Sequence, residues 1–307
     1  MTPLMQAVDD YLKVRRAMGF KLQREGWRLP QFVRFLDEHG AAYIITSLAM
    51  RWALESSVPD THAWRARLQM VRRFAHFVQA HDSRTEIPTK DMAPAPPRRR
   101  TPPYVYSDQD IQILIRATRS LPPFKADTYA TVFGLLAATG IRVGEAIRLD
   151  RSDVCWRDAT LLIRQTKFGK SREVLLHPST IAALQSYASL RDTTLAQPQS
   201  DAFFLSLTGK RLISQNVHHT FLRLIRRTEL AHREPKRPTL HDLRHTFAIN
   251  TLIRSHQLEM DVPAHLPHLS TYLGHGHPDS TYWYLTATPE LLRLASMRLE
   301  LTQGGLP

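Results

Sequence analysis

A proline-rich stretch about one third of the way along the chain limits its possible folds more than any other feature. Residues 93–103 read Ala-Pro-Ala-Pro-Pro-Arg-Arg-Arg-Thr-Pro-Pro. Proline fixes its own φ angle, donates no backbone hydrogen bond and favours extended geometry, so a helix cannot pass through this stretch. The sequence therefore predicts two separately folded domains, residues 1–93 and 104–307, joined by a semi-rigid linker over residues 94–103.

Both predicted domains are basic. The 307 residues contain 41 Lys and Arg against 28 Asp and Glu, which gives a formal net charge of +13. Residues 1–103 hold 17 basic and 10 acidic side chains, and the remaining residues hold 24 and 18. An excess spread over the whole chain favours a protein that surrounds a polyanion such as a nucleic acid. Charge alone fits a basic protein of another kind equally well.

The remaining composition indicates the compartment. The single cysteine, Cys155, excludes an internal disulfide and is typical of a reducing environment. The first seven residues lack the basic and then apolar segments that begin a signal peptide. No apolar stretch approaches the roughly 20 residues that a membrane-spanning helix needs. We therefore expect a cytoplasmic protein with no membrane partner.

The first domain shows apolar side chains at helical spacing. The stripes predict four helices, over residues 4–18, around 27–36, over 45–54 and over 62–78. Most basic side chains between the stripes are expected on solvated faces, yet such a module also fits a duplex backbone. Arg72 and Arg73 are our candidates for that contact. Arg98, Arg99 and Arg100 of the linker are further candidates, because they have no obvious partner in a folded domain.

The second domain changes from a helical to a strand-like period and back again. Three strands are predicted, over residues 154–156, 160–165 and 173–176, and they would form a small antiparallel sheet. Helices are predicted around this sheet, over residues 108–119, 127–139, 180–190, 215–230, 243–256, 269–273 and 289–301. The predicted fold class is therefore mainly α with one small three-stranded antiparallel sheet.

Four short motifs in this domain bring basic side chains, imidazoles and a phenol into one order along the chain. They are Thr139-Gly140-Ile141-Arg142-Val143-Gly144-Glu145, then Lys167 at the end of a strand, then His241-Asp242-Leu243-Arg244-His245, and then Leu273-Gly274-His275 with Tyr284 nine residues later. Leu-Gly-His alone is common. The order of all four motifs is what makes the signal strong.

Two of the arginines suit attack on a phosphodiester. Such an ester carries one negative charge, and attack builds a second charge in the transition state. Guanidinium groups present forked donors to the non-bridging oxygens, so Arg142 and Arg244 are the candidates. Arg142 could instead be an ordinary surface arginine on a short helix. Glu145, one helical turn after Arg142, is expected to buttress a guanidinium or to form a simple salt bridge.

The histidines of the third motif allow two interpretations. His241 and Arg244 are three residues apart, so on a helix they share a face and would approach one phosphate together. His241 and His245 also form an i, i+4 pair that could hold zinc. No carboxylate or cysteine supplies an obvious third ligand, so we expect no metal.

Lys167 and Tyr284 are the predicted proton donor and nucleophile. A lysine at a hairpin tip can protonate a leaving oxygen, although Lys170 competes for this role. A free tyrosine has a pKa near 10, so Tyr284 needs a base or cationic neighbours, and Tyr282 is its rival. A covalent tyrosine–DNA bond would store the energy of the broken phosphodiester. We therefore expect no cofactor.

Taken together, these residues resemble the active site of the tyrosine recombinase, or phage integrase, family. Residues 1–93 are similar to its helical, SAM-like core-binding domain and residues 104–307 to its catalytic domain, and in that family the two close around DNA as a C-shaped clamp. The resemblance implies that the scissile phosphate is bound by Arg142, Arg244 and His275. It further implies that His241 accepts the tyrosine proton, Lys167 protonates the 5′ oxygen and Tyr284 forms a 3′-phosphotyrosyl link.

The resemblance also implies partners and a biological setting. Strands would be exchanged through a Holliday junction within a homotetramer on synapsed double-stranded DNA, with residues 289–301 passed to a neighbouring protomer. Sister recombinases or an accessory protein are further partners. The motif around Tyr284 looks most like nucleoid-associated recombinases of bacterial mobile elements, which carry out integration, excision or resolution. The alternatives are a type IB topoisomerase that acts as a monomer and a non-catalytic DNA-binding protein.

Overall fold

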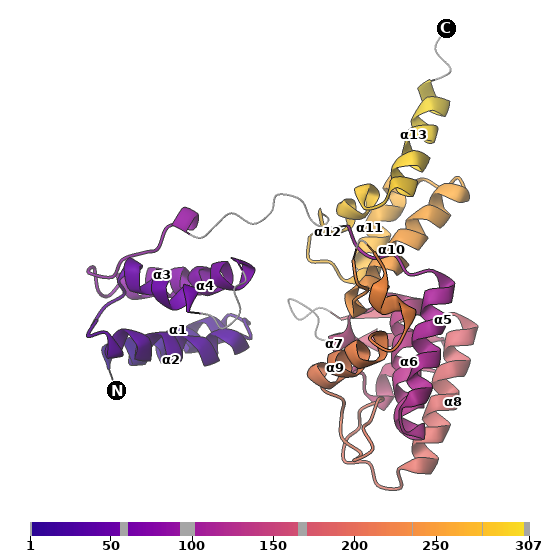
Figure 1. The fold of residues 1–307 in the computed structure, drawn as a ribbon, viewed down its shortest axis with the longest axis horizontal. Coiled ribbons are helices and arrows are strands. Elements are labelled where there is room, and N and C mark those ends of the chain that lie inside the picture. The colour runs from indigo at the N-terminus through magenta and orange to yellow at the C-terminus, as the bar shows by residue number, and fades with distance from the viewer. Residues whose placement is uncertain are drawn as a thin grey trace. The chain divides into compact units, whose positions relative to one another are not determined.

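The chain divides into two compact units, Met1–Arg100 and Thr101–Pro307 (Figure 1). A computed structural model describes residues 2–55, 61–92, 102–164, 171–234, 236–277 and 279–303. The linker arginines Arg98, Arg99 and Arg100 lie outside these described residues, as does Lys167 together with its rival Lys170. No helix in the described part of the chain is both long and apolar enough to cross a membrane.

The first unit is helical, as the sequence predicts. Its elements are α1 (Pro3–Ala17), α2 (Gln23–Glu38), α3 (Thr46–Leu54), α4 (Thr61–Gln79) and the 3-10 turn η1 (Lys90–Met92). In Figure 1, α1 and α2 lie against α3 and α4. The apolar stripes meet in one core, where Val8, Phe32 and Phe74 are fully buried. Burying such side chains contributes about 1.5–3 kcal/mol each.

The second unit wraps helices around a small sheet. Its helices are α5 (Asp108–Ala117), η2 (Thr118–Ser120), α6 (Pro123–Thr139), α7 (Val143–Ala146), η3 (Arg151–Asp153), α8 (Pro178–Thr194), α9 (Ser214–Ile225), η5 (Glu229–His232), α10 (Leu240–Gln257), α11 (Val262–Leu273), α12 (Asp279–Tyr282), η6 (Trp283–Thr286) and α13 (Pro289–Gln303). The fold is therefore mainly α with one small sheet, which confirms the prediction.

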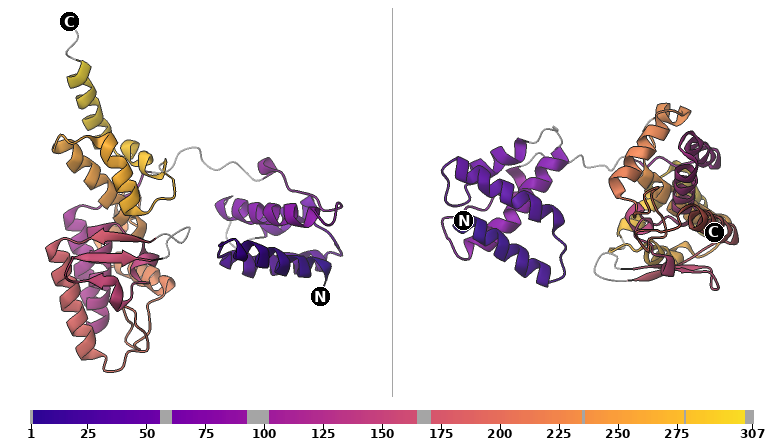
Figure 2. Two further views of the ribbon diagram at one scale, coloured as in Figure 1. Left: turned by 180° about the vertical axis from the view of Figure 1, so that it is seen from behind. Right: turned by 90° about the horizontal axis from the view of Figure 1, so that it is seen from below.

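The sheet has three antiparallel strands in the order β1 (Val154–Cys155), β2 (Thr160–Ile163) and β3 (Arg172–Leu175). Its strands are drawn as arrows in the left view of Figure 2. Leu161 pairs with Val174, and both side chains are fully buried on one face of the sheet. Ile163 pairs with Arg172. The sheet thus fixes Arg172 at the start of β3, and this position matters for the site described below.

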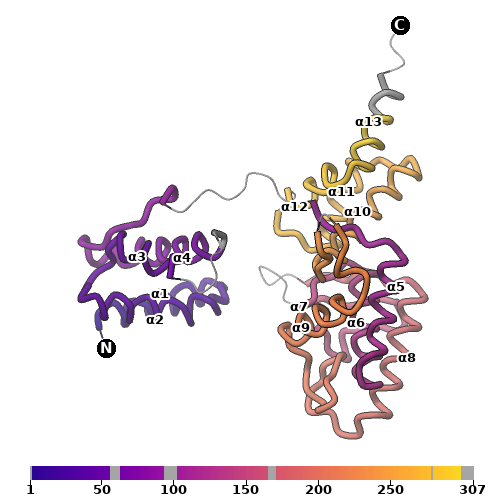
Figure 3. The backbone as a smooth tube through the Cα atoms, in the orientation of Figure 1, coloured from indigo at the N-terminus to yellow at the C-terminus, as the bar shows by residue number. Residues whose placement is uncertain are grey.

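Helix α10 belongs to two cores. Leu240 and Leu243 in its first turns pack in the core built around α5, α6, α8 and α9. Ala248, Ile249 and Leu252 in its later turns pack in a second core with α11, η6 and α13. Figure 3 shows these C-terminal elements gathered beside α10. The side chains near the start of α10 therefore lie where the two cores meet.

Several helices differ in length from the prediction. Helix α6 begins at Pro123, four residues early, because proline suits the first turn of a helix. Helix α11 begins at Val262 and not at Leu269, with Asp261 as its N-cap and two prolines within it. Those prolines made the predicted helix too short. Pro263 lies in the first turn, where the missing N–H has no helical partner, so it is tolerated, whereas Pro267 lies inside the helix and removes one backbone hydrogen bond.

Two other boundaries follow from capping and turn geometry. Helix α10 begins at Leu240 and not at Leu243, because Thr239 and Asp242 form a reciprocal capping box. Helix α9 ends at Ile225 and not at Leu230, where a separate 3-10 turn buries Leu230. A 3-10 turn keeps the i, i+3 spacing of apolar residues, so the sequence pattern does not reveal the break.

Gly140, the C-cap of α6, generates a stability prediction. Its φ angle is +62°, and a Cβ atom there would lie 2.6 Å from the Phe247 ring. We expect Gly140→Ala to lower the free energy of unfolding by about 1–3 kcal/mol, through left-handed strain and overpacking. Gly134→Ala, within the same helix and with no atom nearby, is the matched control and should be neutral or slightly stabilising. Equal losses in urea titrations would contradict this explanation.

Candidate active site

Gly140 and the short helix α7 place Arg142. Because Gly140 adopts the left-handed conformation, the chain turns out of α6, and Arg142 becomes the N-cap of α7. The Arg142 guanidinium donates to Glu145 Oε1 at 2.8 Å and to the Gly274 carbonyl at 3.0 Å. Its side chain keeps about a third of its surface open to solvent, at 37%. Arg142 is therefore fixed on one side and accessible on the other.

Glu145 is buried between two arginines. Besides Arg142 it binds Arg172, whose two terminal nitrogens donate to its carboxylate at 3.3 and 2.8 Å. Burial opposes ionisation of this carboxyl, but the hydrogen bonds and charges of Arg172 and Arg142 prevail and lower its pKa to about 2. Glu145 is therefore ionised at neutral pH, and it buttresses two guanidinium groups at once. Arg172 was not a candidate from the sequence.

Arg244 is the most deeply buried of these arginines. Only 2% of its surface is exposed, and it donates to the carbonyls of Gly140 at 2.9 Å and Leu273 at 2.7 Å. Burial and the charge of Arg142 lower the pKa of Arg244 to about 10. The guanidinium therefore remains protonated at neutral pH.

The C-terminal end of α11 holds all three arginines together. Its last carbonyls accept hydrogen bonds from Arg172 at Tyr272, from Arg244 at Leu273 and from Arg142 at Gly274. The end of a helix carries partial negative charge and free carbonyl groups, so it offsets part of the repulsion between guanidinium groups. A cluster of positive charge is thus built at one point of the second unit.

His275 follows directly after this helix end. Gly274 is left-handed and ends α11, and His275 Nδ1 hydrogen-bonds the Thr281 hydroxyl at 2.7 Å. The ring stacks on Tyr284 with centroids 6.2 Å apart. Burial and the charges of Arg244 and Arg142 lower the pKa of His275 to about 3, so the ring is neutral at neutral pH. The tautomer that accepts from Thr281 keeps Nε2–H as a donor.

Tyr284 lies inside the cluster, whereas its rival does not. Tyr284 belongs to η6 and is 2% exposed, and Tyr282 on α12 is 51% exposed. The Tyr284 hydroxyl lies 2.9 Å from His245 Nδ1. Tyr284 is also close enough to Arg244 for its phenolate to favour the charged guanidinium. The geometry therefore favours Tyr284 over Tyr282 as the nucleophile.

His241 reaches this group through His245. The two rings meet edge to face with centroids 4.6 Å apart. His241 keeps contact with solvent, yet protein packs closely around it, and this desolvation together with Arg244 lowers its pKa. Within the described ranges, no group of three or more His, Cys, Asp or Glu side chains is placed to hold a metal ion, so the pair has no third ligand there. His245 is engaged with Tyr284.

The structure thus brings together most of the predicted residues and adds two. Arg142, Glu145, Arg244, His275 and Tyr284 form one linked cluster, with His241 at its edge; Lys167 falls outside the described residues. The additions are Arg172 and His245. The i, i+4 histidine pair was a signal for His245, whereas the sequence held no local signal for Arg172.

The predicted DNA contacts Arg72 and Arg73 differ from each other. Arg72 Nε donates to the Pro88 carbonyl at 2.6 Å, and its NH2 group donates to the Thr89 carbonyl. Arg72 therefore holds the chain after α4, and its contact with DNA stays a prediction. Arg73 is exposed and lines a cavity of about 520 Å³ between α2 and α4, together with Arg24, Arg28 and Arg67.

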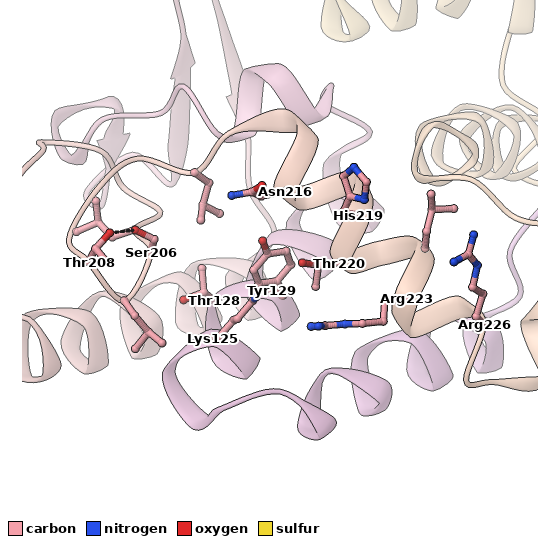
Figure 4. Close-up of a pocket in the computed structure, with 14 residues that line it drawn as sticks. Lys125, Thr128, Tyr129, Ser206, Thr208, Asn216, His219, Thr220, Arg223 and Arg226 are labelled. Atoms are coloured by element: carbon pink, nitrogen blue, oxygen red, sulfur yellow. Dashed lines mark hydrogen bonds between the residues drawn. The ribbon is translucent and has the colours of Figure 1, made fainter. Parts of the chain in front are cut away.

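A second basic hollow lies on the second unit, away from the cluster around Tyr284. It is a cavity of about 780 Å³ between the start of α6, the loop 205–208 and α9 (Figure 4). Lys125, Arg223 and Arg226 line it, and none of the three forms an ion pair within the described part of the chain. No predicted catalytic residue lines this hollow. It is a basic surface separate from the active site.

Comparisons with known proteins agree with this arrangement. A model of the phage integrase family matches residues 105–290. The chain is 42% identical to the Sinorhizobium fredii protein y4rB, named as an integrase/recombinase, over 98% of both chains. It is 25% identical to the tyrosine recombinase XerC of Chlamydia caviae, over 74% of this chain and 68% of the other.

A solved structure shares the fold. The Tn1549 transposon integrase in complex with transposon right end DNA matches with a TM-score of 0.67 and 18% identity, over 97% of this chain and 99% of that one. The chain therefore belongs to the phage integrase family, the family of the tyrosine recombinases. The family predicted from the sequence is confirmed.

The Glu145 pairs generate a pH-dependent prediction. Because the pKa of Glu145 falls from 4.5 to about 2 on folding, its ionisation stabilises the fold above pH 4.5 by about 3 kcal/mol. That contribution is lost as pH falls through about 2. We expect Glu145→Gln to be less stable than wild type by about 3 kcal/mol at pH 7, with a smaller difference at pH 3. Urea titrations measure both, and a difference independent of pH would contradict the assignment.

Proposed function

We propose that the protein is a site-specific DNA recombinase that cleaves and rejoins DNA through a covalent bond to Tyr284. One observation carries this proposal: the Tyr284 hydroxyl is hydrogen-bonded to an imidazole inside a cluster of guanidinium groups. Such surroundings favour a phenol that ionises as it attacks and an acceptor that carries negative charge.

The phosphate would be bound by Arg142, Arg244 and His275. The bonds of Arg244 to Gly140 and Leu273 employ two of its five N–H donors, so others can reach non-bridging oxygens. About a third of the Arg142 side chain is open to solvent, and the Nε2–H of His275 supplies a neutral donor. Glu145, which is itself bound by Arg172, holds the Arg142 guanidinium in place before DNA binds. Fixed donors need no reorganisation as charge develops, which lowers the barrier.

The reaction would exchange one ester bond for another. Tyr284 Oη attacks the phosphorus, the bond to the 5′ oxygen breaks, and a 3′-phosphotyrosyl link forms. Lys167 would protonate the leaving oxygen, and an imidazole of α10 would take the phenol proton. Because the ester energy is kept in the new bond, the 5′ hydroxyl of a partner duplex can attack it without ATP. That second attack exchanges strands.

We further propose a two-domain organisation and assembly on DNA. Residues 1–93 would be the core-binding domain and residues 104–307 the catalytic domain, joined by residues 94–103. A homotetramer on synapsed double-stranded DNA would resolve a Holliday junction, as the family resemblance implies. Helix α13 supports exchange between protomers, because Leu291 is buried on its own unit whereas Leu292 is 50% exposed. The integrase/recombinase name of y4rB favours a mobile element as the setting.

The nucleophile is tested first. We incubate the protein with duplex DNA from the flanks of its own gene, without divalent metal, and stop with detergent. Wild type is expected to form a covalent protein–DNA adduct, and Tyr284→Phe is expected to form none. Tyr282→Phe is the matched control and should retain the adduct, because that side chain is exposed outside the cluster. An adduct that persists in Tyr284→Phe and vanishes in Tyr282→Phe would contradict the assignment.

DNA contacts of the first unit give a further prediction. We expect Arg73→Ala to weaken binding of any duplex and to reduce the salt dependence of binding by about one ion. Arg72→Ala should instead lower stability by about 1–3 kcal/mol, because it leaves the carbonyls of Pro88 and Thr89 without their donor. Fluorescence anisotropy over a salt series and thermal melts measure the two effects. A reversed pattern would contradict this division of roles between Arg72 and Arg73.

A further inference from the structure

His245 makes a direct contact that the predicted mechanism does not use. Its Nδ1 atom lies 2.9 Å from the Tyr284 hydroxyl, and its ring meets the rings of Tyr284 and Trp283 at centroid distances of 5.5 and 5.3 Å. Both partners belong to η6, the element that carries the nucleophile. His245 is therefore the side chain of α10 that is held against the reacting oxygen.

Resting on the proposed function, we propose that His245 takes the proton of the Tyr284 hydroxyl, a role that the family resemblance gave to His241. His245 Nδ1 already lies within hydrogen-bond distance of the proton to be moved, which is the first requirement of a general base. His241 lies behind it, with its ring 4.6 Å from the His245 ring. His241 is then a neighbour that lowers the pKa of His245.

The proton and the electrons balance within this pair. As the Tyr284 Oη–P bond forms and the P–O5′ bond breaks, the phenol proton moves to Nδ1 of a His245 that carries its own proton on Nε2. The imidazolium that results returns the proton to Oη when the phosphotyrosyl bond is broken in the rejoining step. No oxidant, metal or further acid is needed at this atom.

The surroundings link this base to the arrival of DNA. The titratable and charged groups around His245 are His241, Asp242 and Arg244 on α10, Lys236 before it, Tyr284 on η6 and His275 after α11. Burial and then His241 lower the pKa of His245 to about 4; Asp242 opposes them, and Lys236 and Arg244 add smaller lowering effects. The ring is then neutral and ready to accept. A bound phosphodiester adds negative charge to the cluster, which favours the imidazolium and so strengthens the base.

Imidazole nitrogen NMR of the full chain tests the contact without DNA cleavage. The His245 signals are identified by their absence in His245→Gln. At pH 7 we expect an unprotonated Nδ1 whose signal moves in Tyr284→Phe, and we expect inorganic phosphate, as the probe, to raise the pKa of His245. A protonated Nδ1 at pH 7, or a pKa unchanged at saturating phosphate, would overturn the proposal.

Single-turnover adduct formation tests the role in the reaction. On the gene-flank duplex, His245→Phe and His245→Gln should react about 100-fold more slowly than wild type, with unchanged DNA affinity and with rates that rise with pH. His241→Gln should lose less. Near-wild-type rates for His245→Gln, which can still accept a hydrogen bond, would overturn proton transfer and leave orientation alone.

Two controls keep the outcomes distinct. Thermal melts identify a variant that fails to fold, and His245→Gln is the milder of the two changes. An adduct missing from wild type would contradict the proposed function and not the His245 contact, because the NMR result decides the latter by itself.

Discussion

Repulsion between three guanidinium groups is the constraint on which the active site depends. Arg142, Arg172 and Arg244 converge at one point of the second unit, where Arg172 and Arg244 are shielded from solvent and Arg142 is open on one side. Glu145 neutralises one charge and binds two of the groups, and the carbonyls that end α11 bind all three. Positive potential can then be kept in place for a phosphodiester. Burial above all, with a smaller contribution from this potential, lowers the pKa of His245 and His275, so the two imidazoles act as acceptors and donors and not as cations.

Much of the fold and part of the site could be predicted from the sequence, for identifiable reasons. Apolar periodicity located the helices of the first unit and the three short strands, because each buries one face. The order of the four motifs indicated the family. Arg172 was missed because its role requires that β3 and α7 meet, which no local pattern contains. His245 was missed because the sequence does not distinguish the two histidines of α10, which are four residues apart. Only the packing of η6 against one of them does so.

Arg72 and Arg73 show the same limit at the level of a single helix. They are neighbours in the sequence and equal in charge. They differ because Arg72 donates to two carbonyls of the segment that follows α4. A side chain that is hydrogen-bonded to two carbonyls is held in place by the fold, whereas a solvent-exposed side chain is available to a ligand. Net charge therefore predicts the class of partner, whereas packing decides which basic side chains can contact that partner.

The position of α10 in two cores has a further consequence. Arg142 is carried by elements of the first core, whereas Tyr284 and His275 are carried by elements that pack in the second, and α10 is shared between them. The proposed nucleophile and Arg142, a proposed phosphate ligand, therefore belong to two layers of the same unit. Any movement of α11–α13 away from α10 separates them and removes the carbonyls that hold the arginines. The cluster around Tyr284 is therefore complete only when the C-terminal layer is packed on α10.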